Sequence, residues 1–232
     1  MNRSLKERSS EKIKKKLIRS ILEQEWATND SLPPERELAT HYQVGRPTIR
    51  EALQRLERDG WITIRKGAPA IVNDYWKHGN LMTIVNILQQ HDDIPDEFIV
   101  YMLELRITLT PAYVRDSLLH HSLQIISLFI PLQELTDDPK SYADFDWKLQ
   151  KSIAELSPNP VFLLILNSFE DIYGKMAEKY FLEPSHRRAS KAYYEQFLEA
   201  TLKGDLDHAE SLTKQMMATS LELWKTKMNG GV

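Results

Sequence analysis

Apolar side chains recur at helical spacing in three stretches of the first 60 residues, which predicts three amphipathic helices. Their apolar positions are Ile13, Leu17, Ile18, Ile21 and Leu22; Leu38, Ala39 and Tyr42; and Ile49, Ala52, Leu53 and Leu56. Pro34 and Pro47 stand at the expected starts of the second and third helices, where the missing N–H of proline costs nothing. Gly45 between them permits a sharp turn.

The pattern changes after Gly60. Residues 61–64 are β-branched or aromatic, residues 70–72 form a second short apolar run, and the turn between them contains Arg65, Lys66 and Gly67. This is typical of a two-stranded wing after a helix-turn-helix. The basic turn fits a DNA groove; the alternative is that Arg65 and Lys66 belong to a solvated loop.

The third helix has two unlike faces. Arg46, Thr48 and Arg50 cluster at its start and are expected to point away from the apolar stripe. Helix-turn-helix proteins insert this end into the major groove, where arginine reads guanine through two parallel hydrogen bonds. We therefore expect Arg46 and Arg50 to read bases.

From residue 81 onward the periodicity is helical throughout, which predicts an antiparallel helical bundle. The expected segments are 81–90, 96–118, 122–135, 142–156, 161–181, 186–203 and 205–228. The expected fold is mainly α: a winged helix-turn-helix over residues 1–73, a linker over 74–80, and an all-α domain over 81–232. Trp76 in the linker either plugs a surface groove or fixes how the domains sit.

Charge is divided unevenly along the 232 residues. Residues 1–78 hold 16 Lys and Arg against 11 Asp and Glu, whereas the rest is acidic, so only the first part suits a polyanion. Lysines 12, 14, 15 and 16 and Arg19 either touch phosphates or form a solubilising face. The chain has no cysteine, a polar basic start and no apolar run of membrane-spanning length, and we expect a cytoplasmic protein without a membrane partner.

The last helix places Ser220 on an apolar face between Met216 and Trp224. Two interpretations stay open. The Ser220 hydroxyl bonds back to the carbonyl of residue 216, or it lines a ligand cavity with Trp224 as the apolar wall.

The motif Leu32-Pro33-x-Glu35-Arg36-Glu37-Leu38, followed by Arg46-x-Thr48-x-Arg50-Glu51 and Arg58-Asp59-Gly60-Trp61, resembles the winged helix of the GntR superfamily of bacterial transcription regulators. Asn159-Pro160, Tyr173, Tyr180-Phe181 and the spacing of Ser220 and Trp224 resemble its FadR-type branch, which responds to fatty acyl-CoA. The resemblance covers nearly the whole chain. It implies DNA contacts at Arg36, Arg46, Thr48, Arg50, Lys66 and Gly67, with Arg36 and Thr48 mostly on the backbone.

The same resemblance implies an acyl-CoA site made of Arg106, Tyr173, Tyr180, Lys214, Met217, Ser220 and Trp224. The basic residues suit phosphates, and the aromatic residues suit the acyl chain and thioester. Met217 replaces a family glycine and Gln150 replaces an aromatic residue.

A rival branch of the superfamily binds small carboxylates through a metal held by one aspartate and three histidines. Asp146 stands at the aspartate position, but Gln150, Tyr194 and Met216 occupy the histidine positions, and these are poor metal ligands. The seven histidines show no ligand spacing, and we expect them in surface or linker positions. No nucleophile with an adjacent base and no phosphate loop is present, so an enzyme is not expected.

The sequence as a whole predicts a homodimeric regulator of fatty acid metabolism that needs no cofactor. Two winged helices bind a pseudo-palindromic operator, and long-chain acyl-CoA in the helical domain releases it. Two alternatives stay open: a regulator of the same superfamily that responds to another small metabolite, and a dimeric DNA-binding protein without a ligand.

Overall fold

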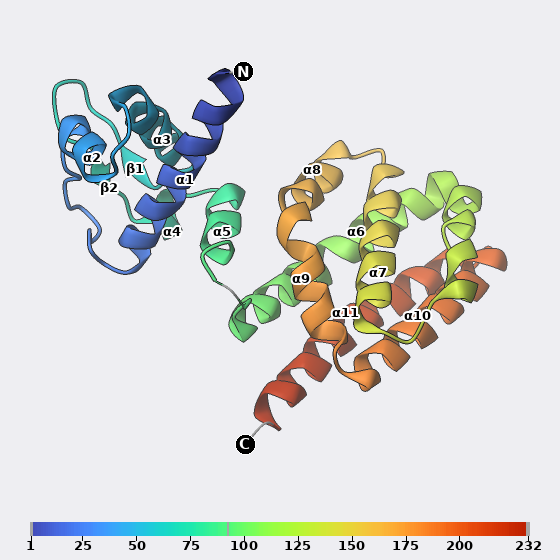
Figure 1. The fold of residues 1–232 in the computed structure, drawn as a ribbon. Coiled ribbons are helices and arrows are strands. Elements are labelled where there is room, and N and C mark those ends of the chain that lie inside the picture. The colour runs from blue at the N-terminus through green and yellow to red at the C-terminus, as the bar shows by residue number, and fades with distance from the viewer. Residues whose placement is uncertain (1, 92, 231–232) are drawn as a thin grey trace. The chain divides into compact units, whose positions relative to one another are not determined.

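The computed structural model describes residues 2–91 and 93–230, with side chains from residue 9 onward. It divides into two compact units, Met1–Asp92 and Asp93–Val232. Both are built from helices, and the one small sheet of the described residues lies in the first unit (Figure 1). The mainly α fold class expected from the sequence is confirmed.

The first unit is a winged helix. Its elements are α1 (Asn2–Leu22), α2 (Glu35–His41), α3 (Arg46–Arg58), β1 (Ile62–Thr63), β2 (Ile71–Val72), α4 (Tyr75–His78) and α5 (Leu81–Leu88). Helix α1 packs against α3, and the apolar stripes expected on both helices are buried except for Leu22, which is partly exposed. The two strands pair antiparallel, with Ile62 opposite Val72, and Trp61 is fully buried beside them.

The turn between α2 and α3 differs in one detail from the expectation. Gly45 has a φ of −68°, which any residue can adopt, whereas Gln43 has a φ of +54°. The left-handed residue of this turn is therefore Gln43. Gly45 caps α3 in an extended conformation, and Pro47 lies in the first turn of that helix.

Residues 74–88 belong to the first unit and are hydrogen-bonded to the end of its helix α3. Thr83 Oγ1 donates to the Asp59 carbonyl at 2.7 Å, and Asn86 Nδ2 donates to the Asp59 carboxylate at 3.2 Å. Gly60, with a φ of +83°, passes so close to this segment that an added Cβ would lie 2.2 Å from the His78 carbonyl. We expected a linker over 74–80 and the second domain from 81. In the structure, helix α5 packs on α1, and the compact units are Met1–Asp92 and Asp93–Val232.

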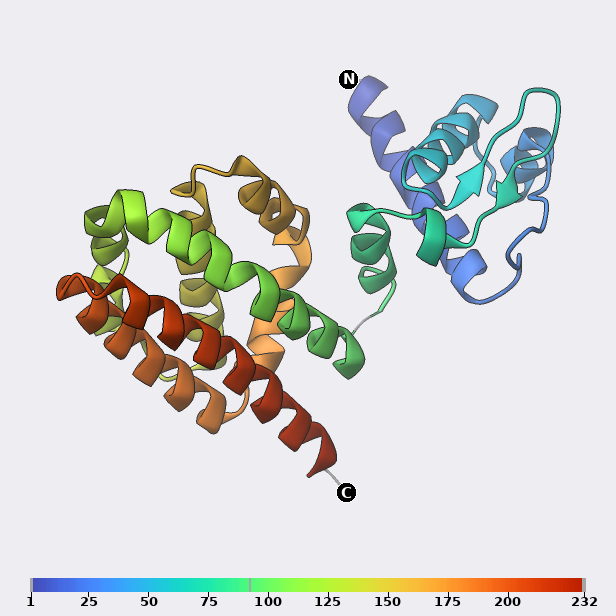
Figure 2. The same cartoon turned by 180° about the vertical axis from the view of Figure 1, so that it is seen from behind.

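The second unit is a bundle of long helices. Its elements are α6 (Asp96–Ser127), a 3-10 turn η1 (Ile130–Glu134), α7 (Pro139–Glu155), α8 (Pro160–Ser168), α9 (Glu170–Phe181), α10 (Pro184–Leu202) and α11 (Leu206–Asn229). Helix α11 runs alongside α6 and packs against α10, and α7 packs against α9 (Figure 2).

Two helix limits in this unit differ from the expectation. The expected helices 96–118 and 122–135 are largely one kinked helix, α6, whose non-helical residue is His121. The expected helix 161–181 is broken at Phe169, which ends α8 and begins α9. The buried Phe169 ring, 2% exposed, anchors this break in the core. Among the described residues no helix is both long and apolar enough to cross a membrane.

Candidate nucleic-acid interface and ligand site

A cleft of about 750 Å³ lies on the first unit between the start of α2, the exposed side of α3 and the turn of the wing. It is lined by residues 33–36, Arg46, Arg50, Leu53, Gln54, Glu57 and residues 64–70. Five of the six residues predicted to meet DNA line this one cleft, namely Arg36, Arg46, Arg50, Lys66 and Gly67. Segments about 30 residues apart in sequence thus bring their basic side chains to the same surface.

Thr48, the sixth predicted residue, does not share this surface. Its side chain is only 9% exposed, so the expectation that it points away from the apolar stripe with Arg46 and Arg50 is wrong. Thr48 lies one helical turn before Ala52, which is fully buried. The start of α3 therefore presents Arg46 and Arg50, both exposed, and turns Thr48 inward.

Arg50 is held by Glu35 across the cleft. Its Nε donates to Glu35 Oε1 at 3.0 Å and its Nη2 to Oε2 at 2.8 Å, a forked pair of parallel bonds. The Arg50 hydrogen bond lowers the pKa of Glu35, and the nearby charge of Arg46 lowers it further. The same bond raises the pKa of Arg50. The carboxylate at the cleft is therefore ionised and bound.

The wing is fixed to α3 by the second carboxylate of the cleft. The Ile64 amide donates to Glu57 Oε1 at 2.8 Å. Gly67 at the turn has a φ of +78°, a conformation that favours glycine, and Lys66 beside it is exposed. Arg65 and Lys66 both line the cleft.

One lysine of the expected basic face of α1 is not available to phosphates. Lys14 is 4% exposed, and its Nζ lies 3.4 Å from an Asp59 carboxylate oxygen. Lys12, Lys15, Lys16 and Arg19 are exposed, as a basic face requires.

The second unit contains a buried polar cluster centred on Asp146 of α7. Tyr173 and Tyr194 both donate to this carboxylate, the latter at 2.9 Å, and Arg106 Nη2 lies 3.2 Å from it. Burial and the Asp146 charge raise the pKa of both tyrosines well above the usual value. Burial lowers the pKa of Arg106, but the attractions to Asp146 and to the neighbouring tyrosines together outweigh burial and raise it. The cluster therefore holds one charged pair and neutral tyrosines.

The other predicted ligand residues form a second, apolar group. Met217, Ser220 and Trp224 of α11 are 2%, 3% and 0% exposed. Ser220 Oγ donates to the Met216 carbonyl at 2.9 Å, which is the first of the two interpretations given above. The Trp224 ring lies 6.0 Å from that of Tyr180, and burial raises the pKa of Tyr180 to about 12. Lys214 stands apart, exposed and paired with Glu210.

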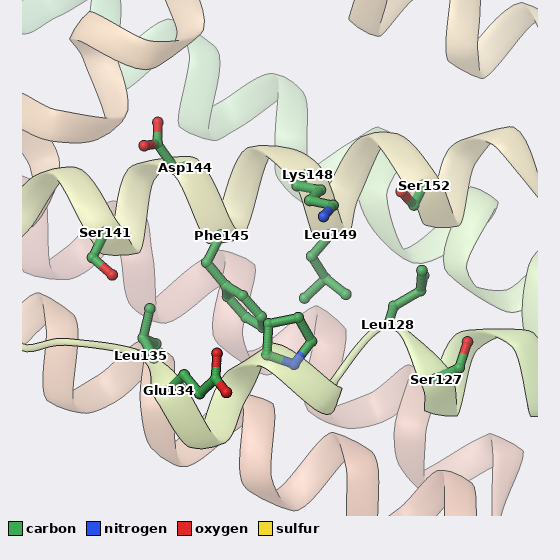
Figure 3. A pocket seen from close by; sticks show the side chains of 11 residues that line it. Ser127, Leu128, Glu134, Leu135, Ser141, Asp144, Phe145, Lys148, Leu149 and Ser152 are labelled. Atoms are coloured by element: carbon green, nitrogen blue, oxygen red, sulfur yellow. The ribbon is translucent and has the colours of Figure 1, made fainter.

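Of two cavities in the second unit, only the smaller one touches predicted ligand residues. A small one of about 30 Å³ touches Arg106 and Tyr173. A groove of about 390 Å³ lies between the end of α6, η1 and α7, where Phe145 and Leu149 point into it and Asp144, Lys148 and Ser152 lie along its α7 edge (Figure 3). None of the seven predicted ligand residues lines this larger groove.

Comparison with known proteins decides the family. Residues 9–72 match the gntR family of bacterial regulatory proteins, and residues 73–230 match the FadR C-terminal domain. The chain belongs to the GntR family. The FadR-type resemblance is thereby confirmed, as is the expectation of a transcription regulator and not an enzyme.

Relatives of this GntR-family regulator cover most of its length. The fatty acid metabolism regulator protein of Shewanella pealeana is 32% identical over 212 residues, 91% of this chain and 89% of its own. That of Klebsiella pneumoniae is 31% identical over 209 residues, or 90% and 87% of the two chains. Among solved structures, that of Lar, which controls the expression of the Listeria monocytogenes agr system, has a TM-score of 0.56 at 18% identity, with 93% and 96% coverage. This last likeness concerns the fold.

In this GntR-family regulator, three of the four positions of the rival metal site, Asp146, Gln150 and Tyr194, belong to the polar cluster, and the fourth is the apolar Met216. Tyr194 and Gln150 both donate to Asp146 Oδ1, the latter at 3.4 Å. Asp146 thus accepts hydrogen bonds from two side chains, Tyr194 and Gln150, at positions where the rival branch has metal-binding histidines. Among the described residues, no group of three His, Cys, Asp or Glu side chains is arranged to hold a metal ion.

Sequence reasoning missed three residues that shape these sites: Glu35, Tyr113 and His186. Tyr113 donates to Gln150 from the core of α6. His186 is 2% exposed and stacks on Tyr180 at 4.3 Å, so the expectation of surface or linker positions for all histidines is wrong for this one. Its position offered a signal, because Tyr193 and Phe197 follow it at i+7 and i+11 on one helical face.

Proposed function

We propose that this regulator controls genes of fatty acid metabolism by binding operator DNA in the cleft of its first unit. The observation that carries the proposal is the convergence of Arg36, Arg46, Arg50, Lys66 and Gly67 on one surface. Relatives about 30% identical over most of the chain bear the name of fatty acid metabolism regulators. The regulator would act in the cytoplasm, where bacterial DNA lies.

Different residues of the cleft contribute sequence specificity and binding affinity. Arg46 and Arg50 at the start of α3 read base edges in the major groove, since this helix end enters the groove in helix-turn-helix proteins. Arg36 contacts the phosphate backbone, and Lys66 with Gly67 follows the neighbouring groove. Phosphate contacts supply affinity and base contacts supply sequence preference. The buried Thr48 side chain takes no part.

Long-chain fatty acyl-CoA is the proposed effector, bound in the second unit and lowering operator affinity. Arg106 supplies a positive charge, and Tyr173, Tyr180 and Trp224 supply apolar surface. The Tyr180 hydroxyl is buried near Ser220 without a hydrogen bond of ordinary geometry, which leaves a donor for a ligand oxygen. Because Tyr180, Met217 and Trp224 are buried, binding requires them to move apart.

A homodimer completes the mechanism. Two copies of α3 fit two half-sites one helical turn apart, about 34–36 Å. An effector that favours another spacing of the two reading helices lowers affinity for both half-sites together.

A second candidate is a regulator that responds to a smaller metabolite. The groove of about 390 Å³ between η1 and α7 favours it, because this groove is open without movement of the core and combines Phe145 and Leu149 with the charged Lys148 and Asp144 (Figure 3).

Thermal unfolding with oleoyl-CoA, with free CoA and with neither distinguishes these functions. A ligand that binds only the folded state stabilises it by about 2.7 kcal/mol at a hundredfold excess over its Kd. We expect oleoyl-CoA, and not CoA, to raise the melting temperature and to release a duplex that the protein has selected from a random-sequence pool. Equal melting temperatures with and without oleoyl-CoA would count against the effector assignment and leave DNA binding untouched.

A further inference from the structure

Glu35 is an acidic residue in a cleft proposed to receive a polyanion. Its carboxylate is partly exposed, lies beside Arg46 and Arg50, and faces the surface where DNA phosphates would approach. Such a charge repels DNA, so a carboxylate with no task at this position would only weaken binding. The geometry of its bond to Arg50 indicates what that task is.

A guanidinium has two edges that can make forked hydrogen bonds. One consists of Nε and Nη2, and the other consists of Nη1 and Nη2. Glu35 occupies the first edge of Arg50, with bonds of 3.0 and 2.8 Å. Among the described residues no partner is bonded to Arg50 Nη1, so the Nη1/Nη2 end can present the two parallel donors that guanine O6 and N7 accept.

We propose that Glu35 is a positioning residue for sequence readout: it holds the Nε/Nη2 edge of Arg50 so that Arg50 meets guanine with its Nη1/Nη2 end. The proposal rests on the proposed DNA-binding function of this cleft. Glu35 acts through Arg50 and does not itself contact the base.

The arrangement lowers the entropic cost of reading a base. A free arginine side chain samples many rotamers, and a contact to guanine restricts it to one or a few of them. Exposed ion pairs contribute little to stability as a rule. A forked arginine–carboxylate pair nevertheless fixes the orientation of the guanidinium, because its two hydrogen bonds define the plane of the group. The Arg50 side chain is 57% exposed, so without this fork most of its surface would contact only solvent, which does not orient it.

The neighbouring Glu37 supplies a matched control. It lies in the first turn of the same helix and carries the same charge, but it does not line the cleft. Glu35→Gln and Glu37→Gln each remove one negative charge near the DNA, so both should strengthen binding to a duplex of unrelated sequence to a similar degree. Only Glu35→Gln breaks the fork on Arg50.

The test uses the full-length protein and the duplex that the wild type selects from a random-sequence pool. Each guanine is replaced in turn by 7-deazaguanine, which lacks the N7 acceptor, and affinities are measured by fluorescence anisotropy. For the wild type and Glu37→Gln, we expect one guanine in each half-site whose replacement weakens binding by about five- to a hundredfold. In Glu35→Gln this ratio should fall severalfold, and in Glu35→Ala it should fall toward that of Arg50→Ala.

Three results would overturn the inference. If Glu35→Gln discriminates as well as Glu37→Gln, the fork has no role in readout. If Glu35→Gln binds the selected duplex more tightly than Glu37→Gln and still discriminates, Glu35 is a competitor that DNA displaces. If Arg50→Ala itself keeps the discrimination, the assignment of Arg50 to bases fails instead. Thermal melting of each variant verifies that the fold is intact, which the exposure of both side chains favours.

Discussion

Arg46 and Arg50 lie on the exposed side of a helix whose opposite side is completely packed. Ile49, Ala52 and Leu56 are fully buried, so the helix cannot rotate without opening the core of its unit. This fixes the direction in which the two arginines project. The chemistry of the reading surface is thus set by residues that never meet DNA.

Replacing Arg50 by alanine should weaken binding to the selected duplex by about ten- to a hundredfold, because one bidentate contact to guanine contributes roughly 1–3 kcal/mol. The melting temperature should stay within a degree or two, since Arg50 lies outside the core. Lys12→Ala, which removes an exposed charge of α1 outside the cleft, is the control. An equal loss of affinity in both variants would show that Arg50 contributes only charge.

His186 gives the second unit a dependence on pH. Burial lowers the pKa of His186 below its ordinary value near 6.5, even though the Tyr180 carbonyl, 2.7 Å from its Nδ1, favours the charged form. The unfolded chain therefore binds a proton more readily than the native one, and native stability falls as the pH drops below about 6.5.

Chemical denaturation of the second unit between pH 7.5 and 5.5 should show this loss in the wild type and a shallower slope in His186→Gln. His208→Gln, at an exposed site on α11, should keep the wild-type slope. Parallel slopes for the wild type and His186→Gln would mean that other groups cause the pH dependence.

At the scale of elements, α5 belongs to the DNA-binding unit because of a buried hub at Asp59. Asp59 is 1% exposed. Its carboxylate accepts hydrogen bonds from Lys14 of α1 and Asn86 of α5, and its backbone carbonyl accepts one from Thr83. Asp59 directly follows α3, so the hub joins the end of the reading helix to the last helix of its unit. A movement of α5 therefore reaches the end of α3 through the two hydrogen bonds that Thr83 and Asn86 make to Asp59.

Asp59→Ala should destabilise the first unit by about 3 kcal/mol, because Lys14 loses its buried partner and keeps only the partly exposed Glu11, and Asn86 loses its acceptor. The amides of α5 should then exchange with deuterium faster than in the wild type, which mass spectrometry measures. Asp74→Ala, which breaks the exposed pair with Lys77, should leave stability nearly unchanged. Unchanged protection of α5 in Asp59→Ala would show that apolar packing alone holds this helix.

Much of the element order was predictable, and the errors have identifiable physical causes. Pro34, Pro47 and the apolar spacing defined helices correctly because these signals are local. Lys14 was misassigned although it lies on the same helical face as Leu17, Ile18 and Ile21, since its burial depends on Asp59, 45 residues away. The break at Phe169 and the Glu35–Arg50 fork depend likewise on partners that no local pattern names.

At the scale of the whole molecule, the regulator combines a basic DNA-reading unit with an acidic helical unit that holds buried polar groups. The proposed coupling needs a ligand to rearrange α11, where Trp224 donates through its indole Nε1 to the Asp96 carbonyl at 3.2 Å. Asp96 is the first residue of α6. The Trp224 side chain therefore links the interior of the second unit to the start of α6, the first helix of that unit.

Trp224→Ala should blunt the release of the selected duplex by oleoyl-CoA, with an effective concentration at least tenfold higher than for the wild type. It should also cost about 3–5 kcal/mol of stability, as for other large-to-small core substitutions. Trp224→Phe, which keeps most of the volume but removes the indole donor, separates the two effects. Release at the wild-type concentration in both variants would exclude this tryptophan from the effector site.

The close approach of Gly60 to His78 has a practical consequence for anyone who wishes to study the DNA-binding part by itself. A fragment that ends at residue 73, where the wing is complete, would omit α4 and α5 and uncover the apolar surface that Val85 and Leu88 protect. A soluble fragment should extend through residue 91. Cloning boundaries drawn from the winged-helix motif alone would discard part of the hydrophobic core.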